Sequence, residues 1–126
     1  MALTCTYHNS TGRLVCTDAS GRTTVDETGY SGTGAGRNNP DMANVANVGP
    51  IPEGGYSVGT GHAGGHTGPQ TLNVDADAGT NTHGRDAFRI HGDNARHDAS
   101  EGCIIMPRSV RDTISNAGGA HLTVTR

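Results

Sequence analysis

The sequence predicts a mainly β fold, a sandwich or barrel with one or two short helices. Glycine accounts for 20 of the 126 residues, and together with Asn, Asp, Ser and Thr it marks many tight turns. Between these turns, apolar residues recur two positions apart, as expected for short strands with one buried face. Only one segment places apolar residues at a clear helical spacing. Many short strands, frequent turns and little helix are typical of a sandwich or a barrel.

The N-terminal part is expected to be extended. Residues 2–8 and 13–17 flank a turn at residues 9–12 and form a predicted hairpin. Residues 23–33 form a further extended segment between flanking glycines.

A long polar loop follows at residues 34–52, with one helical turn expected before Gly49-Pro50 stops it. Loops of this length in compact domains are usually functional or mobile, so we expect this one to border the site. A single helix is expected at residues 107–116, where Val110 and Ile114 lie four positions apart. Four more strands are predicted at residues 55–60, 70–75, 86–91 and 120–125.

Length and charge narrow the classes of protein. A chain of 126 residues suits one domain, residues 1–126, with a single core. Its basic residues are scattered arginines and its net charge is −3, which argues against nucleic-acid binding. No apolar run reaches 18 residues, and the first residues lack the basic and apolar parts of a secretion signal. We therefore expect neither membrane insertion nor a cleavable signal peptide.

Two of the three cysteines flank the first predicted turn. A four-residue loop at residues 9–12 would pair Cys5 with Cys16, whereas a three-residue loop with Gly12 left-handed would shift the register by one. We hypothesise a disulfide between them, conditional on an oxidising compartment. Two reduced thiols in a hairpin are the alternative, because cytosolic thiols stay reduced.

Cys103 and His91 form a candidate nucleophile and base. A thiol is activated by an imidazole that takes its proton or stabilises the thiolate. Gly102 lets another backbone segment approach the sulfur, so that amide N–H groups there could form an oxyanion hole. Gly92 permits a sharp turn after the histidine, and either a backbone carbonyl near Gly92 or the Asp93 side chain could orient the imidazole. A structural cysteine beside a surface histidine is the alternative reading of the same residues.

These residues resemble a known catalytic motif. His91-Gly92 and Ser100-Glu101-Gly102-Cys103 resemble the L,D-transpeptidase motif, in which a His-Gly pair precedes Ser-His-Gly-Cys. Further similarity is carried by Gly29-Tyr30-Ser31-Gly32 and by the stretch from Asn47 to Tyr56. On these segments the chain resembles the type VI secretion L,D-transpeptidase effector family over nearly its whole length.

The resemblance implies an L,D-transpeptidase-like catalytic domain with Cys103 as nucleophile and His91 as base, and with no cofactor. Its substrate would be the tetrapeptide stem of peptidoglycan. The stem would be cut between the L-centre of the diamino acid and the terminal D-alanine, or that D-alanine would be exchanged for another D-amino acid. The resemblance also implies a secretion apparatus that delivers the protein from the producer's cytoplasm to a neighbour's periplasm. A cognate immunity protein is implied as well, and we expect it to occlude the cleft that contains Cys103.

The sequence departs from the broader motif at Glu101, which stands where a second histidine is usual. In the broader motif that histidine would help to position the substrate. Here this role is either lost, taken over by the Glu101 carboxylate, or moved to His97. Alternatively, Glu101 is simply a solvated residue of the turn, which is the commoner situation for an exposed glutamate. Ser100 could bond the substrate, although serines there more often stabilise the turn. Arg89 and Arg108 are candidate clamps for substrate carboxylates, because a guanidinium fork matches a carboxylate.

Two other functions are compatible with the residues. A metal-dependent peptidase would draw ligands from His91, Asp93, His97 and Asp98, with His62, His66 or His83 completing the set, but no closed zinc pattern occurs. A non-catalytic wall-binding module would use the glycine loops as recognition surfaces. Such modules usually need aromatic platforms, and this chain has only three Tyr and one Phe.

Overall fold

A computed structural model describes residues 2–94, 100 and 102–126. Within these residues, short strands predominate and one α-helix lies near the C-terminus. The strands are β1 (Leu3–His8), β2 (Arg13–Thr17), β3 (Thr23–Thr28), β4 (Tyr30–Ser31), β5 (Gly54–His62), β6 (Thr71–Ala76), β7 (Phe88–His91), β8 (Ile104–Ile105) and β9 (Ala120–Thr125). The helices are α1 (Arg108–Asn116) and the 3-10 turns η1 (Gly34–Gly36), η2 (Pro40–Met42) and η3 (Gly65–Thr67).

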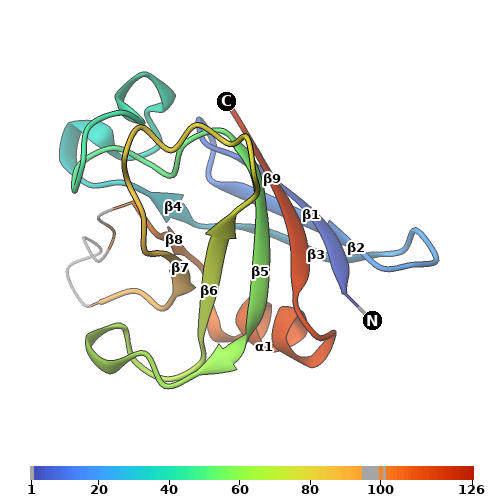
Figure 1. The fold of residues 1–126 in the computed structure, drawn as a ribbon. Helices are drawn as coiled ribbons and strands as arrows, with labels where there is room; N and C mark the ends of the chain where they lie inside the picture. Colours follow the sequence, from blue (N-terminus) through green and yellow to red (C-terminus); the bar gives the residue numbers. More distant parts are fainter. Residues whose placement is uncertain (1, 95–99, 101) are drawn as a thin grey trace.

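The strands of the described residues form one sheet, in the order β3-β2-β1-β9-β5-β6-β7-β8-β4. Most neighbouring strands are antiparallel, but β1 lies parallel to β9 and β7 lies parallel to β8. The two edge strands, β3 and β4, follow each other in the chain with only Gly29 between them. The sheet therefore nearly closes into a barrel (Figure 1), and the predicted mainly β fold class is confirmed.

Gly29 lies where the two edges of the sheet meet. Its N–H donates to the carbonyl of Gly12 at 2.8 Å. A Cβ added to Gly29 would lie 1.7 Å from the carbonyl oxygen of Ile105 in β8. A side chain at residue 29 would therefore push β8 away, so the near-closure of the barrel requires glycine there.

Helix α1 connects the two sides of the curved sheet. It contacts β3 at one end of the strand order and β5 and β6 nearer the middle, and it buries Val110 and Ile114. Pro107 immediately precedes the helix, where the N–H that proline lacks has no partner to lose. No helix among the described residues has the length and apolar character needed to cross a membrane.

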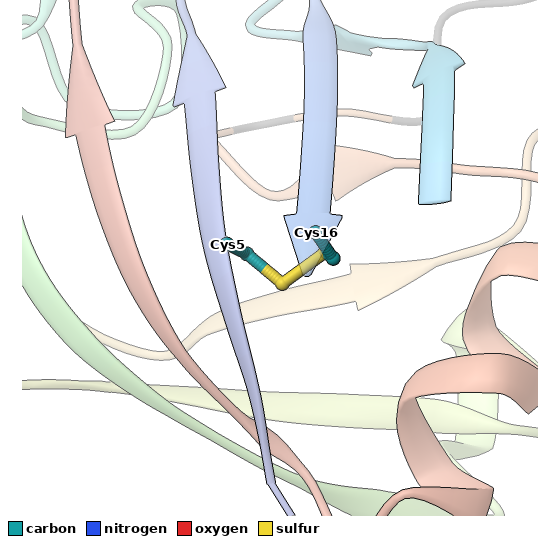
Figure 2. Close-up of a disulfide and its surroundings, with 2 residues drawn as sticks. All are labelled: Cys5 and Cys16. Atoms are coloured by element: carbon teal, nitrogen blue, oxygen red, sulfur yellow. A yellow bond between two sulfur atoms is a disulfide. The ribbon is translucent and has the colours of Figure 1, made fainter. Parts of the chain in front are cut away.

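The hairpin of β1 and β2 resolves the two registers left open by the sequence. Cys5 lies opposite Cys16, as the four-residue loop requires. Figure 2 shows the two cysteines joined by a disulfide across these adjacent strands. Both cysteines are buried on the inner face, so the bridge belongs to the hydrophobic core.

Other expectations differ from the structure in detail. The extended segment at residues 23–33 divides into β3 and β4, because the chain crosses from one edge of the sheet to the other at Gly29. The loop at residues 34–52 contains two 3-10 turns instead of one helical turn. The sequence did not predict β8, because a two-residue strand is too short to show alternation.

Candidate active site

The short parallel pair β7 and β8 brings His91 and Cys103 to one cavity. His91 is the last residue of β7, and Cys103 immediately precedes β8. Ile90 pairs with Ile104 and His91 with Ile105, so the two candidate residues lie on neighbouring segments. Both line a cavity of about 830 Å³, and Asn47 from the loop at residues 34–52 lines it too. The imidazole is nearly buried, with 4% of the His91 surface exposed.

A backbone carbonyl orients the imidazole of His91. Its Nδ1 lies 2.8 Å from the carbonyl oxygen of Gly92. A carbonyl oxygen only accepts hydrogen bonds, so Nδ1 must carry the proton in this contact. The other ring nitrogen, Nε2, then has the lone pair that a general base needs. Of the two orienting groups suggested by the sequence, the Gly92 carbonyl makes this contact, while Asp93 Oδ1 accepts from the Tyr30 hydroxyl at 2.6 Å.

Two fully buried serines hold the turn before Cys103. Ser100 Oγ donates to the Cys103 carbonyl and accepts from the N–H groups of Gly32 at 2.8 Å and Gly102 at 3.2 Å. Ser31 Oγ donates to the Gly102 carbonyl at 3.2 Å and accepts from the Ile51 N–H at 2.9 Å. Ser100 therefore stabilises the turn, and the N–H of Gly102 is used within it. An oxyanion role for Gly102 stays a prediction.

Arg85 packs directly beneath this turn. Its guanidinium donates to the carbonyls of Ala43 at 2.6 Å, Pro50 at 2.8 Å and Gly49 at 3.1 Å. A Cβ added to Gly102, whose φ is +123°, would lie 2.3 Å from Arg85 Nη2. Burial lowers the pKa of Arg85, while attraction to the Tyr56 and Cys103 side chains opposes that change. The attraction is mutual, so Arg85 favours a thiolate at Cys103.

Arg111 of α1 occupies the space left by the missing side chain of Gly92. Its Nη2 would lie 3.0 Å from a Cβ added to Gly92. The backbone of Gly92 is not left-handed, so its conformation does not call for glycine, and the missing side chain instead leaves room for this close approach. Arg111 lines the cavity of His91 and Cys103 and also a second cavity of about 410 Å³. Sequence reasoning missed both Arg85 and Arg111, because isolated arginines are usually surface residues.

The sequence matches the family of the Tlde1 domain over residues 26–124. The chain belongs to the Tlde1 domain family. This is the family of type VI secretion L,D-transpeptidase effectors.

Among solved structures, the chain is similar to the helical cell shape determining protein Pgp2 from Campylobacter jejuni, with a TM-score of 0.63 and 12% identity. The match covers 99% of this chain but only 48% of that protein, so this chain spans about half the length of that protein. At this identity the likeness concerns the fold alone. The sequence matches none of the curated proteins.

The two arginines predicted as carboxylate clamps lie in different surroundings. Arg89 lines the larger cavity, and its Nε lies 3.4 Å from Asn73 Oδ1. Arg108 pairs with Asp112 at 3.0 Å, has 58% of its side chain exposed, and is not among the described residues that line either cavity. Glu101 and His97 lie outside the described residues, as does Asp98.

The residues proposed as metal ligands do not gather in the part of the chain that the structure describes. Within the described residues (2–94, 100 and 102–126), the structure contains no group of three or more His, Cys, Asp or Glu side chains that could hold a metal ion. His62, for example, contacts the carbonyl of Ala63 and Asn73 Oδ1 in the β5–β6 region.

Proposed function

We propose that this protein acts on the tetrapeptide stems of peptidoglycan by cysteine-dependent acyl transfer, as an L,D-carboxypeptidase, as an L,D-transpeptidase that exchanges D-amino acids, or as both. One observation carries the proposal. Cys103 and His91 line the same cavity from neighbouring segments, and the contact of His91 Nδ1 with the Gly92 carbonyl leaves Nε2 to act as the base.

The reaction follows from this arrangement. His91 Nε2 takes the thiol proton, and the Cys103 sulfur attacks the carbonyl carbon at the L-centre of the diamino acid. The C–N bond then breaks, the amine of D-alanine leaves with the proton from His91, and a thioester remains on Cys103. Water resolves this thioester in hydrolysis, whereas the amine of another D-amino acid resolves it in exchange. In both cases the sulfur leaves as a thiolate and recovers its proton through His91.

The position of Arg85 supports the first step. A cation close to a cysteine stabilises the thiolate, which is the form that attacks a carbonyl. The guanidinium of Arg85 lies against Gly102 and is attracted to the Cys103 side chain. It is held by three backbone carbonyls, so its charge stays in place while the thiol loses its proton.

The proposal includes a place of action. Disulfides persist in oxidising compartments such as the bacterial periplasm and are rare in the cytosol. The Cys5–Cys16 bridge therefore suits a protein that is made in the producer's cytoplasm, delivered by the secretion apparatus, and active in the periplasm of a target cell. A cognate immunity protein would then block the cavity that contains Cys103 and His91.

Mass spectrometry of tetrapeptide muropeptides tests the reaction. We expect the wild-type domain to release D-alanine, and to incorporate an added D-amino acid if exchange occurs. Cys103→Ala should abolish both products while keeping the thermal unfolding profile, and His91→Gln should reduce the rate by about 100-fold or more. Cys103→Ala that retains full activity would overturn the proposal.

Two further measurements separate the alternatives. Activity that survives a chelator but requires Cys103 supports the thiol mechanism, whereas activity lost with the chelator and kept in Cys103→Ala indicates a metal-dependent peptidase. A Cys103 thiol that resists iodoacetamide, together with unchanged muropeptides, indicates a wall-binding module.

A further inference from the structure

The side chain of Arg111 has one nitrogen that the fold does not use. Nε donates to the Met106 carbonyl at 3.1 Å, and Nη1 donates to the carbonyls of Pro69 at 2.9 Å and Gln70 at 3.1 Å. Nη2 has no hydrogen-bond partner among the described residues. Only 8% of the Arg111 surface is exposed, so the whole side chain is held firmly while this one nitrogen has unused donors.

Nη2 lies beside the backbone that follows the proposed base. Nη2 is the atom of Arg111 closest to the open side of Gly92, which is the residue after the base His91. Arg111 lies on the wall shared by the two cavities, together with Gly92 and Asp93. A ligand in the cavity of Cys103 can therefore approach Arg111 on the His91 side.

No carboxylate among the described residues is hydrogen-bonded to Arg111, although the carboxylate of Asp112 attracts it from nearby. Its three hydrogen bonds go to neutral carbonyls. The nearby carboxylate of Asp112 accepts instead from Arg108 Nε at 3.0 Å and from Gln70 Nε2 at 2.6 Å. Burial lowers the pKa of Arg111, which reflects the cost of keeping a guanidinium charge out of water. An anion bound at Nη2 would offset that cost.

We propose that Arg111 Nη2 binds the terminal carboxylate of the stem peptide and makes the domain specific for stems that end in a free D-alanine. This inference rests on the proposed function. His91 protonates the leaving amine, so the leaving D-alanine lies on the His91 side of the scissile bond. Its carboxylate is attached to the same carbon as that amine, which brings it to the region beside Gly92. There a guanidinium N–H and a carboxylate oxygen form a strong, charge-assisted hydrogen bond.

The other candidate clamps are less suited to this role. Arg108 is bound to Asp112 and is mostly exposed. Arg89 lines the cavity but is only partly buried, so holding its long side chain in one position would cost more conformational entropy. Arg111 is already fixed by three hydrogen bonds, so it loses little freedom when it binds a carboxylate.

The test compares two synthetic tetrapeptides, one ending in D-alanine with a free carboxylate and one ending in D-alanine amide. We expect wild-type kcat/KM to favour the acid by about 10- to 100-fold, as for a hydrogen bond between charged groups. In Arg111→Met, the rate on the acid should fall relative to that on the amide, so that the acid-to-amide ratio approaches one. Because both substrates are compared in one preparation, a lower folded fraction does not alter the ratio. Arg22→Met, at an exposed turn, is the control and should keep the wild-type ratio.

A second variant covers the case in which Arg111→Met fails to fold. Gly92→Ala places a methyl group about 3.0 Å from Nη2 while keeping the arginine. It should lower the acid-to-amide ratio by displacing Nη2. The inference is overturned if the acid-to-amide ratio of Arg111→Met stays at the wild-type value. If Arg111→Met does not fold, the same result in Gly92→Ala overturns it.

A binding measurement separates this inference from the proposed function. Calorimetry with Cys103→Ala and the two peptides should show tighter binding of the acid, and the preference should vanish in Cys103→Ala/Arg111→Met. A preference that depends on Arg111 without cleavage by the wild type would support the carboxylate site and overturn the proposed reaction. If the wild type cleaves the peptide but its preference for the acid does not depend on Arg111, the proposed reaction is supported and the carboxylate site is overturned.

Discussion

The two ends of the curved sheet hold neighbouring strands together in different ways. Strands β1 and β2 pair over five residues in antiparallel register and are joined by the Cys5–Cys16 disulfide. Strands β7 and β8 pair in parallel over two residues only. Around the second pair, buried Ser31, Ser100 and Arg85 bind backbone groups instead.

The difference shows what a reactive cysteine requires of its surroundings. The disulfide stabilises the first pair covalently. Its formation uses up both thiols, so neither can react further. In the proposed mechanism Cys103 has to keep its thiol, and the second pair is held through the backbone groups next to it. Each of those groups is buried, which makes the loss of one partner expensive. The site region should therefore depend on a few polar side chains, while the hairpin region should depend on its covalent bridge.

Replacing Arg85 should have the largest effect on this comparison. Arg85→Met leaves three backbone carbonyls without their donor, so we expect the free energy of unfolding to fall by about 4 kcal/mol. The thiolate of Cys103 also loses an attracting charge, so iodoacetamide alkylation should require a higher pH. Urea unfolding and the pH profile of alkylation measure the two effects.

Arg85→Lys serves as the matched control. It keeps the positive charge but lacks the planar fork that reaches several carbonyls at once. Its alkylation profile should stay closer to that of the wild type than its stability does. If the profile of folded Arg85→Met coincides with that of the wild type, Arg85 holds the loop at residues 43–50 and does not act on the thiol.

Ser100→Ala should rank next. It removes the acceptor of the Gly32 and Gly102 N–H groups and the donor to the Cys103 carbonyl, at a cost of about 3 kcal/mol. The turn should also become less ordered, so the alkylation rate of Cys103 should change. Ser57→Ala is a suitable control, because Ser57 is exposed and its hydroxyl donates a hydrogen bond to Asp77 at 3.3 Å. An unchanged stability in Ser100→Ala would show that the backbone bonds alone hold this turn.

These polar contacts mark the limit of what the sequence could predict. Alternation and turn residues identified the hairpin and most strands, and the spacing of Val110 and Ile114 identified α1, because these signals are local. The motif residues identified His91 and Cys103 as candidates. Strand β8 was missed because two residues cannot show a period. Arg85 and Arg111 were missed because only the tertiary fold buries them, and the reason for Gly92 depends on a guanidinium 19 residues away in the chain.

Removing the disulfide should affect stability but not the site. With a sequence separation of 11 residues, the bridge contributes about 3 kcal/mol by restricting the unfolded chain, so Cys5→Ala/Cys16→Ala should lower Tm by roughly 10 °C. Below the unfolding transition, the alkylation rate of Cys103 should stay within about twofold of the wild type, because the bridge lies in another part of the sheet. Thiol titration of the unfolded wild-type chain checks the premise, and three reactive thiols would rule the bridge out.

The smallest effects should come from exposed carboxylates in the two regions. The hydrogen bonds from Arg13 hold the pKa of Asp26 below its ordinary value of 3.8, and those from Arg108 and then Gln70 do the same for Asp112. A carboxyl whose pKa is lowered by folding stabilises the protein above its ordinary pKa, and this contribution disappears as the pH falls through the lowered value. Stability of the wild type should therefore decline below about pH 4.

Asp26→Asn and Asp112→Asn should each make that decline slightly shallower, since each removes one proton-linked group. Both carboxylates are exposed, so solvent screens them and either change should be far smaller than the effects above. Urea midpoints measured between pH 2 and pH 7 give the comparison. If Asp112→Asn destabilised the protein as much as Ser100→Ala does, the contacts of Asp112 with Arg108 and Gln70 would be among the interactions that hold the site region. The contrast between buried backbone contacts and exposed ion pairs would then be wrong.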